Sequence, residues 1–241
     1  MAYFKYFPKI FYRFGDTADR SIAQNLTAYA DILDNVKDAT SFYTDYYIAD
    51  GERPDHVAYK LYGDANLHWT FYFMNDEIRE RGWPLPYAQV QAKVEKEHPY
   101  IVLNTSEDIV NKFLTHQTIQ GANGTAEVLH RHVRLGQVVV KMVSGSFSNG
   151  EQLDSTNNEG VLETLLVNTV EPEHKSARFY TDIEGNIIDI DPYLGPGVND
   201  IEVTHEEHYH QQNESLKQIR VLRKGNINSV VRAIQDSMGK L

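Results

Sequence analysis

The chain has 241 residues, of which 41% are hydrophobic and 24% charged, so it is long enough to bury a core and its composition excludes global disorder. Its net charge of −11 argues against nucleic acid as the main partner, because binding phosphates requires a basic surface. Since the sequence has no cysteine, disulfides, thiolate metal sites and cysteine nucleophiles are excluded together.

The N-terminal segment is rich in aromatic residues from Tyr3 to Phe14, but Lys5, Lys9 and Arg13 interrupt it. We therefore expect no secretory signal, and no membrane-spanning helix because no stretch approaches about 18 consecutive apolar residues. The aromatic cluster is either an arm that covers the protein's own core or an arm that docks on a neighbouring subunit, where Tyr and Phe are favoured. Apolar residues at helical spacing then predict at least one helix within residues 16–40.

An aromatic-rich unit follows, and it predicts a strand, a turn and two helices. Tyr46–Ile48 has the β-branched and aromatic character of a short strand, and Asp50-Gly51 is a turn signal. Pro54 suits the first position of a helix, because its fixed φ fits there and its missing N–H is not needed. Gly63 is expected to end that helix, and Asn66 is expected to cap the second one.

Two short helices are predicted next, over Pro86–Lys96 and Ser106–Leu114. The apolar pattern then changes to the period of two that is typical of strands. Five short strands are predicted, separated by turn-rich stretches: Val138–Val143, Val161–Val167, Arg178–Thr181, Ile187–Ile190 and Ile201–Thr204. Strands at this spacing suggest a small β-barrel or sandwich.

The C-terminal segment predicts a strand at Ile219–Leu222 and, after Gly225, a final helix at Ile227–Met238. From Lys217 onwards the chain has six basic residues and one acid, whereas the remainder is strongly acidic. The basic helix either neutralises the protein's own acidic surface or binds an acidic neighbour. Its charge is too sparse for a nucleic-acid tail.

A histidine-rich stretch, His205–His210, resembles a metal cluster, but its sequence fits an exposed strand edge better. The spacing of its histidines differs from that of a zinc-protease helix, and its Glu and Gln content is typical of an exposed strand edge. The alternative is a metal site shared by two strands, with His208 and His210 on one and His130 and His132 on the other. We predict no metal site here.

The acid-rich run from Asp182 to Asp191 brings hard oxygen ligands together, as a calcium site does, but it lacks the EF-hand register. Glu184-Gly185-Asn186, between two apolar runs, instead predicts a hairpin turn. The sequence contains no phosphate-binding loop and no nucleophile elbow, and no local pair of carboxylates stands out as catalytic. We therefore expect no enzyme activity, no cofactor and no small-molecule substrate.

Three segments resemble one protein family. The run YYIADGERPDHVAYKLYGDANLHWTFYFMND, followed by WPLP at Trp83–Pro86, resembles the baseplate wedge subunit of T-even-type contractile-tailed phages, the family numbered fifty-three. The opening YFKYFPKIFY at Tyr3–Tyr12 and the tail Asn213–Ile234 are similar to the first and last segments of that family. The resemblance covers roughly residues 1–115 and 205–241, and it implies a LysM-like core used as a structural connector.

The expected fold class is α+β: a LysM-like strand-helix-helix-strand core with an inserted small antiparallel β module and a C-terminal helix. We expect an N-terminal arm and LysM-like wedge domain over residues 1–118 and an inserted β-rich module over 119–204. A C-terminal strand and helix, residues 205–241, are expected to pack back on the wedge domain. The inserted module is longer than the short T-even form needs, and the sequence does not decide its role.

The resemblance implies a structural subunit of a contractile phage tail baseplate wedge, which connects neighbouring wedge proteins during baseplate assembly. Its implied partners are other baseplate wedge proteins and neighbouring wedges in a six-fold assembly, with no nucleic acid and no membrane. Its implied location is the tail baseplate of the virion, assembled in the host cytoplasm.

Such interfaces gain affinity mainly from buried aromatic and Arg anchors. The expected contact residues are Tyr6, Phe7, Tyr12, Tyr46, Tyr47, Tyr59, Tyr62, Arg223 and Arg232. The alternative function is a LysM-type module that binds peptidoglycan or other N-acetylglucosamine glycans by stacking sugars on Trp69, Tyr72 and Trp83. A core role explains these rings as well, since Trp69 and Phe73 lie four residues apart on one helix face.

Overall fold

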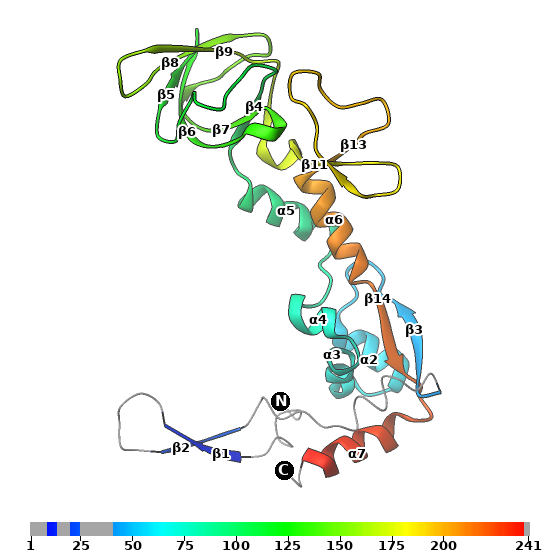
Figure 1. Ribbon diagram of the computed structural model, residues 1–241. Helices are drawn as coiled ribbons and strands as arrows, with labels where there is room; N and C mark the ends of the chain where they lie inside the picture. Colours follow the sequence, from blue (N-terminus) through cyan, green and yellow to red (C-terminus); the bar gives the residue numbers. More distant parts are fainter. Residues whose placement is uncertain (1–8, 14–19, 25–40, 239–241) are drawn as a thin grey trace. The chain divides into compact units, whose positions relative to one another are not determined.

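The computed structural model describes residues 9–13, 20–24 and 41–238, and Figure 1 shows their helices and strands. The structure contains many helices as well as many strands, and the strands form several separate sheets. The predicted α+β class is therefore confirmed.

The chain divides into two compact units. The first unit contains residues 1–87 and 213–241, and the second contains residues 88–212. The boundaries expected after residues 118 and 204 differ from these. The strand at Ile101–Asn104 already pairs with strands of the second unit, which moves the start of that unit towards the N-terminus.

Two short strands of the first unit form an antiparallel pair near the N-terminus. β1 (Lys9–Tyr12) pairs with β2 (Ser21–Gln24), so that Phe11 lies opposite Ile22. Ser21–Gln24, within the range 16–40 where at least one helix is predicted, is therefore a strand, because pairing with an aromatic strand overrides helical spacing there; the helix itself stays a prediction. Residues 16–19 and 25–40 of that prediction lie outside the described residues.

Within the described residues, the other elements of the first unit are β3 (Tyr43–Tyr47), α2 (Pro54–Tyr62), the 3-10 helix η2 (Ala65–His68), α3 (Trp69–Met74), α4 (Asp76–Arg81), β14 (Gln218–Leu222) and α7 (Ile227–Met238). β3 and β14 pair antiparallel, with Tyr46 opposite Ile219. The predicted strands near Tyr46 and Ile219 and the predicted final helix are confirmed. Between β3 and β14 the described part of the first unit has three α-helices, α2, α3 and α4, instead of the two expected in a strand-helix-helix-strand core. The assignment of this core to the LysM fold stays a prediction.

The ends of α2 follow the local sequence. Pro54 is its first residue, and Gly63 ends it in the left-handed conformation with φ of 79°, donating its N–H to the Tyr59 carbonyl at 2.8 Å. The predicted cap Asn66 is wrong: the carboxylate of Asp64 accepts the Asn66 N–H at 2.9 Å and so caps η2, which leads into α3.

The helix α3 contributes to two hydrophobic clusters of the first unit. Phe71 is fully buried in a cluster with residues of α2 and with Ile219 of β14. Trp69 and Phe73, whose rings meet edge to face at 5.2 Å, pack with Leu222 of β14 and with α7. The predicted core role of Trp69 and Phe73 is therefore confirmed.

The second unit carries a helix, ten strands and two 3-10 helices within its described residues, followed by a further helix. They are α5 (Tyr87–Glu97), β4 (Ile101–Asn104), β5 (Thr118–Gln120), β6 (Gly124–His132), η3 (Val133–Leu135), β7 (Gln137–Gly145), β8 (Gln152–Thr156), β9 (Leu162–Leu166), β10 (Thr169–Pro172), η4 (Glu173–Lys175), β11 (Ala177–Thr181), β12 (Ile187–Ile188), β13 (Ile201–Thr204) and α6 (His205–Ser215).

Seven of these strands form one antiparallel sheet in the order β10-β4-β7-β6-β5-β8-β9. Its two outermost strands, β9 and β10, follow one another in the chain, and the intervening Asn168 donates its N–H to the Asn104 carbonyl at 2.7 Å. The sheet therefore curls round one core, as Figure 1 shows. The buried core residues are Leu103, Ile109, Phe113, Ile119, Ala126, Val128, Val138, Val140, Phe147, Leu153, Leu165 and Val167.

All five strands predicted for this region are present, but they belong to two sheets. β7 and β9 join the curled sheet, whereas β11, β12 and β13 form a separate three-stranded sheet with β11 in the middle. The strands β4, β5, β6, β8 and β10 were not predicted. The predicted hairpin turn at Glu184-Gly185-Asn186 is confirmed, because Asp182 accepts the N–H groups of Glu184 and Asn186, each at 2.9 Å, between β11 and β12.

The predicted helix over Ser106–Leu114 is wrong, because groups distant in the sequence bind its backbone. A guanidinium nitrogen of Arg131 donates to the carbonyls of Ile109 at 2.5 Å, Lys112 at 2.6 Å and Val110 at 3.2 Å. The segment is consequently a series of turns, with Phe113 at a positive φ of 53°. A local pattern cannot reveal a donor that only the folded sheet brings to the carbonyls of this segment.

The predicted strand edge at His205–His210 is also wrong, since these residues start α6. Thr204 and Glu207 form a capping box: the Thr204 hydroxyl accepts the Glu207 N–H and the Glu207 carboxylate accepts the Thr204 N–H, both at 3.1 Å. This helix signal was present in the sequence but was outweighed by the polar composition.

We predict that Arg131→Gln destabilises the protein by about 2 kcal/mol, because three carbonyls lose a charge-assisted donor. Urea unfolding at pH 7 measures the change. The control is Lys141→Gln, which alters an exposed cation on β7 and should stay within about 0.5 kcal/mol of the wild type. Equal stability of both variants would show that Arg131 does not organise the 106–114 segment.

Candidate interaction surfaces

Tyr46 and Tyr47 lie on opposite faces of β3, because side chains alternate along a strand. Tyr46 shares its face with Ile219 and packs into the core. Tyr47 lies on the outer face and is 58% exposed, and its hydroxyl donates to the Glu214 carboxylate. This hydrogen bond raises the pKa of Tyr47 and fixes the ring at the surface.

The Tyr46 side chain is engaged in a polar cluster with Glu52 and Lys60. Its hydroxyl donates to Glu52 at 2.8 Å and accepts from the Lys60 ammonium at 3.0 Å, and Lys60 also reaches Glu52 at 3.0 Å. Burial is the main cause of the raised pKa of Tyr46. The backbone carbonyl of Glu52 accepts the indole N–H of Trp83 at 2.6 Å, so the cluster ties α2 to the core.

The two tyrosines of α2 occupy different environments. Tyr59 is 67% exposed. Tyr62 is half-buried, its ring lies 5.9 Å from that of Phe71, and burial raises the pKa of Tyr62 to about 12. Among the tyrosines of β3 and α2, Tyr47 and Tyr59 therefore face solvent, while Tyr46 and Tyr62 support the core.

Arg223 and Arg232 are both exposed. Arg223 follows β14 and donates from Nε to the Tyr43 carbonyl at 2.9 Å. Arg232 lies on the opposite side of α7 from the buried Ile227 and Val230, which is the amphipathic arrangement expected of a surface helix. Both guanidinium groups belong to the basic C-terminal segment.

The antiparallel pair β1–β2 exposes apolar side chains on both of its faces. Tyr12 is 51% exposed, and Phe11 and Ile22, which share the other face, are 73% and 65% exposed. The sequence predicted Tyr12 as a contact residue and missed Phe11 and Ile22, which alternation along a strand would have assigned to one face. The predicted contact residues Tyr6 and Phe7 lie outside the described residues.

The free edge of β14 is capped by a side chain. Asn75 donates its amide N–H to the Arg220 carbonyl at 2.8 Å and accepts the Arg220 N–H at 2.7 Å, so it replaces one residue of a neighbouring strand. A strand from another molecule cannot pair at that point of the edge. The Arg220 guanidinium also lies over the Tyr43 ring at 5.0 Å.

The second unit exposes a group of large apolar side chains that the sequence did not predict. They lie in and beside the three-stranded sheet: Ile183, Ile187, Tyr193, Leu194, Val198 and Ile201. The signal was present, since apolar residues interrupt the Gly- and Pro-rich stretch Tyr193–Asp200, but turn composition alone predicts only a loop.

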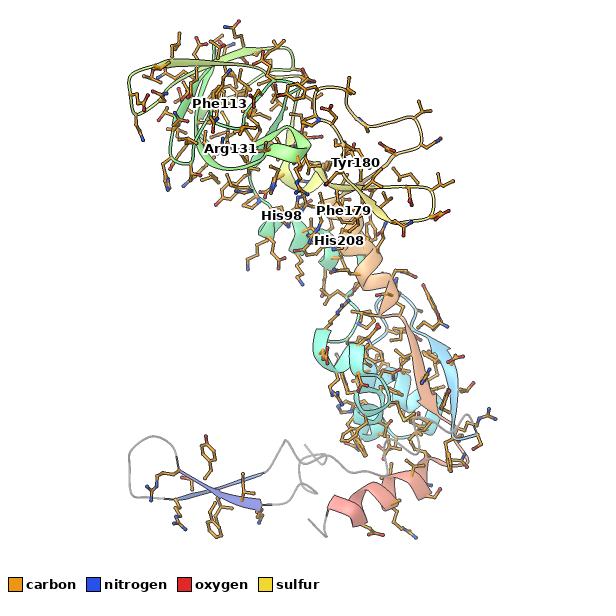
Figure 2. All side chains as sticks on the ribbon, viewed as in Figure 1. His98, Phe113, Arg131, Phe179, Tyr180 and His208 are labelled. Atoms are coloured by element: carbon orange, nitrogen blue, oxygen red, sulfur yellow. The ribbon has the colours of Figure 1, made fainter. Side chains whose placement is uncertain are left out.

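Two of the histidines considered as metal ligands, His205 and His208, lie beside His98 and Phe179 in the second unit, whereas the rings of His130 and His132 pack on each other at 4.9 Å. The rings of His98 and His205 are 4.1 Å apart, His98 Nδ1 lies 3.1 Å from the buried carboxylate of Glu173, and Phe179 meets His208 edge to face (Figure 2). Burial, followed by the charges of His98 and Arg178, lowers the pKa of His205 to about 4.

Within the residues that the structure describes, no group of three or more His, Cys, Asp or Glu side chains is arranged to hold a metal ion. Among the helices of that part of the chain, none is both long and apolar enough to cross a membrane.

Comparison with known proteins identifies a family for the N-terminal part. Residues 3–111 match the sequence model of the family described as base plate wedge protein 53. Two curated proteins described as glutamate decarboxylase beta also share a segment with the chain. The protein from Listeria innocua serovar 6a is 36% identical over 85 residues, and that from Listeria monocytogenes serovar 1/2a is 34% identical over 85 residues. The match covers 35% of this chain and 18% of each Listeria protein.

We predict that the stability of α6 falls between pH 6.5 and about 4. His205 stays neutral in the folded protein until its lowered pKa of about 4, whereas its unfolded form gains a proton below its ordinary pKa of 6.5. Its contribution to stability is therefore complete above pH 6.5 and is lost as the pH falls towards 4. The loss is about 1 to 2 kcal/mol, since the ring is only partly buried.

Amide hydrogen exchange of α6 at pH 7 and pH 5 measures this loss. His205→Phe keeps a ring against His98 and removes the titration, so its exchange should depend less on pH once intrinsic rates are corrected. Exposed His56→Phe is the control and should behave as the wild type. An unchanged pH dependence in His205→Phe would contradict the prediction.

Proposed function

Because residues 3–111 belong to the base plate wedge protein 53 family, we propose that this structural protein of the phage tail baseplate connects neighbouring wedge proteins during assembly. The family match is the observation that carries the proposal. The proposed partners are other wedge proteins, together with neighbouring wedges in a six-fold assembly. The proposed place of assembly is the host cytoplasm.

The exposed aromatic side chains of the first unit support a binding role. Tyr47 and Tyr59 present large rings to solvent on a framework whose other face is buried, and Tyr12 and Phe11 do so on the β1–β2 pair. A rigid, exposed aromatic ring is a favourable interface anchor, because it buries much apolar area at a low cost in conformational entropy. Tyr6 and Phe7 belong to the same proposed arm.

Arg223 and Arg232 are the proposed charged contacts. They lie in the basic segment of a chain whose net charge is −11, so they are suited to pair with an acidic neighbour and to set the register of an interface. Tyr46 and Tyr62, which were expected as contacts, are proposed to act indirectly by holding α2 against the core.

The alternative of glycan binding has less support in the first unit. Trp69 is only 8% exposed and packs against Phe73. Trp83 is half-buried, donates to the Glu52 carbonyl and contacts the rings of Phe71 and Tyr72. Sugar stacking requires an exposed ring face, and these contacts occupy much of the surface of both indoles.

We propose a role in binding rather than catalysis. The two Listeria proteins are described as an enzyme, but the shared segment is 18% of their length and does not carry that activity to this chain. The larger match to a baseplate family supports a structural role.

The proposed connector is tested by binding of the purified full-length protein to the other wedge proteins of its phage. Tyr47→Ala with Tyr59→Ala should weaken retention by a wedge partner about tenfold or more, because each removes an exposed aromatic anchor. Biolayer interferometry measures the affinity, and urea unfolding confirms that the variant is folded.

Tyr87→Ala is the matched control, since Tyr87 is 59% exposed and is not a proposed contact. Insoluble peptidoglycan is the second bait. If the double variant binds the wedge partner as tightly as the wild type does, Tyr47 and Tyr59 are not anchors of that interface. If the protein sediments with peptidoglycan and binds no wedge protein, the connector role is contradicted and the glycan-binding alternative is supported.

A further inference from the structure

A hollow of about 380 Å³ lies in the second unit, between the turn after β6 and the edge of the three-stranded sheet. Arg131 and Arg134 line it from the turn, and Arg178 and Phe179 line it from β11. Residues Ile187–Ile190, which include β12, close its other side. All the lining residues belong to one unit, so the hollow is a feature of that unit's own fold.

The hollow is basic, although the net charge of the chain is −11. Three arginines line it and only one acid, Asp189, does so. Asp189 lies 3.1 Å from the Arg134 guanidinium, but both side chains are largely exposed, at 73% and 81%. Such an exposed ion pair contributes little, so another carboxylate can replace Asp189 at small cost.

Arg178 supplies a second accessible cation. It is exposed, and among the described residues no hydrogen bond or ion pair engages its guanidinium. Two histidines sense its positive charge: after burial, Arg178 lowers the pKa of His208, and it also lowers that of His205.

Arg131 provides a fixed wall of the site. Its hydrogen bonds to three carbonyls of the 106–114 segment hold the side chain in one place. Binding therefore requires little ordering of this part of the hollow, which lowers the entropic cost.

The remaining lining is apolar. Phe179, Ile188 and Ile190 are half-buried at the hollow, and Ile187 is 70% exposed beside it. A phosphate ion alone would leave this apolar side in contact with water. A nucleic acid would meet a chain with a net charge of −11, which disfavours phosphate backbones. A carboxylate flanked by apolar side chains matches both parts of the lining.

We propose that the hollow between the Arg131–Leu135 turn and β11–β12 is a docking site for an acidic peptide segment of another protein. The carboxylate of an Asp or Glu in that segment pairs with Arg178 and Arg134, and its apolar neighbours cover Phe179 and Ile188. The inference rests on the proposed function only for the source of the segment, a neighbouring baseplate protein. The pocket itself is tested independently.

The probe is the capped peptide acetyl-Ile-Asp-Ile-amide, added to the full-length protein labelled with ¹⁵N and ¹³C. The expected result is saturable chemical-shift change at Arg178, Phe179 and Ile188. Arg178→Glu should weaken binding about tenfold or more, and Arg178→Gln should weaken it less. Asp189→Asn should strengthen binding, because it removes the competing internal carboxylate. Lys141→Glu, on β7 outside the hollow, is the matched control and should leave the affinity unchanged.

Three results would overturn the proposal. Equal binding of the isosteric acetyl-Ile-Asn-Ile-amide would show that the arginines do not select a carboxylate. Shifts caused by inorganic phosphate but not by the peptide would make the hollow a phosphate site. Concentration-dependent shifts of the same residues without any probe, abolished by Arg178→Glu, would make the occupant a second copy of the chain.

The same titration separates this inference from the proposed connector role. The Tyr47→Ala, Tyr59→Ala variant should bind the peptide as the wild type does, because its substitutions lie in the first unit. Loss of wedge binding in that variant with normal peptide binding supports both proposals. If Arg178→Glu loses peptide binding but binds wedge proteins as the wild type does, the hollow is a peptide-binding site. In that case the peptide segment does not come from a wedge protein.

Discussion

The antiparallel pairing of β3 with β14 is the constraint on which the first unit depends. It joins residues 43–47 to residues 218–222, and hydrogen bonds from Ile48 N–H to the Lys217 carbonyl at 2.9 Å and from Arg223 N–H to the Phe42 carbonyl at 2.8 Å extend it at both ends. Closing so long a loop costs entropy, which burial on both faces of the pair must offset. One face packs on α2 and Phe71, and the other contributes Leu222 to the cluster with α7.

This pairing also decides which aromatic side chains are available for binding. Tyr46 and Tyr47 are adjacent in the sequence, yet one is drawn into the polar cluster with Glu52 and the other faces solvent. The same holds on α2, where Tyr59 faces solvent and Tyr62 packs near Phe71 in the core. An assembly role is consistent with such a division, because buried tyrosines fix the framework and exposed ones supply contact area. The family that matches residues 3–111 is described as a base plate wedge protein.

The sequence predicted those elements whose signals are local. The Pro54 start and Gly63 end of α2, the final helix and five strands of the second unit follow from caps, turns and periodicity. The segment 106–114 could not be predicted, since Arg131 and the buried Glu163, which accepts the Phe113 N–H at 2.9 Å, act on it from other strands. The candidate contacts were predicted by residue type, but their exposure depends on which face meets the core. The basic hollow was not predictable, because three segments distant in the sequence create it.

The most direct test of the connector role is site-specific photo-crosslinking in assembled phage tails. A benzoylphenylalanine placed at position 47, and in a second experiment at position 59, reports which protein lies against each exposed ring. A third, placed at the fully buried position of Phe71, is the negative control for contacts between proteins. We expect crosslinks from positions 47 and 59 to another baseplate wedge protein. Crosslinks confined to this chain, or no crosslinks in intact tails from either position, would contradict it.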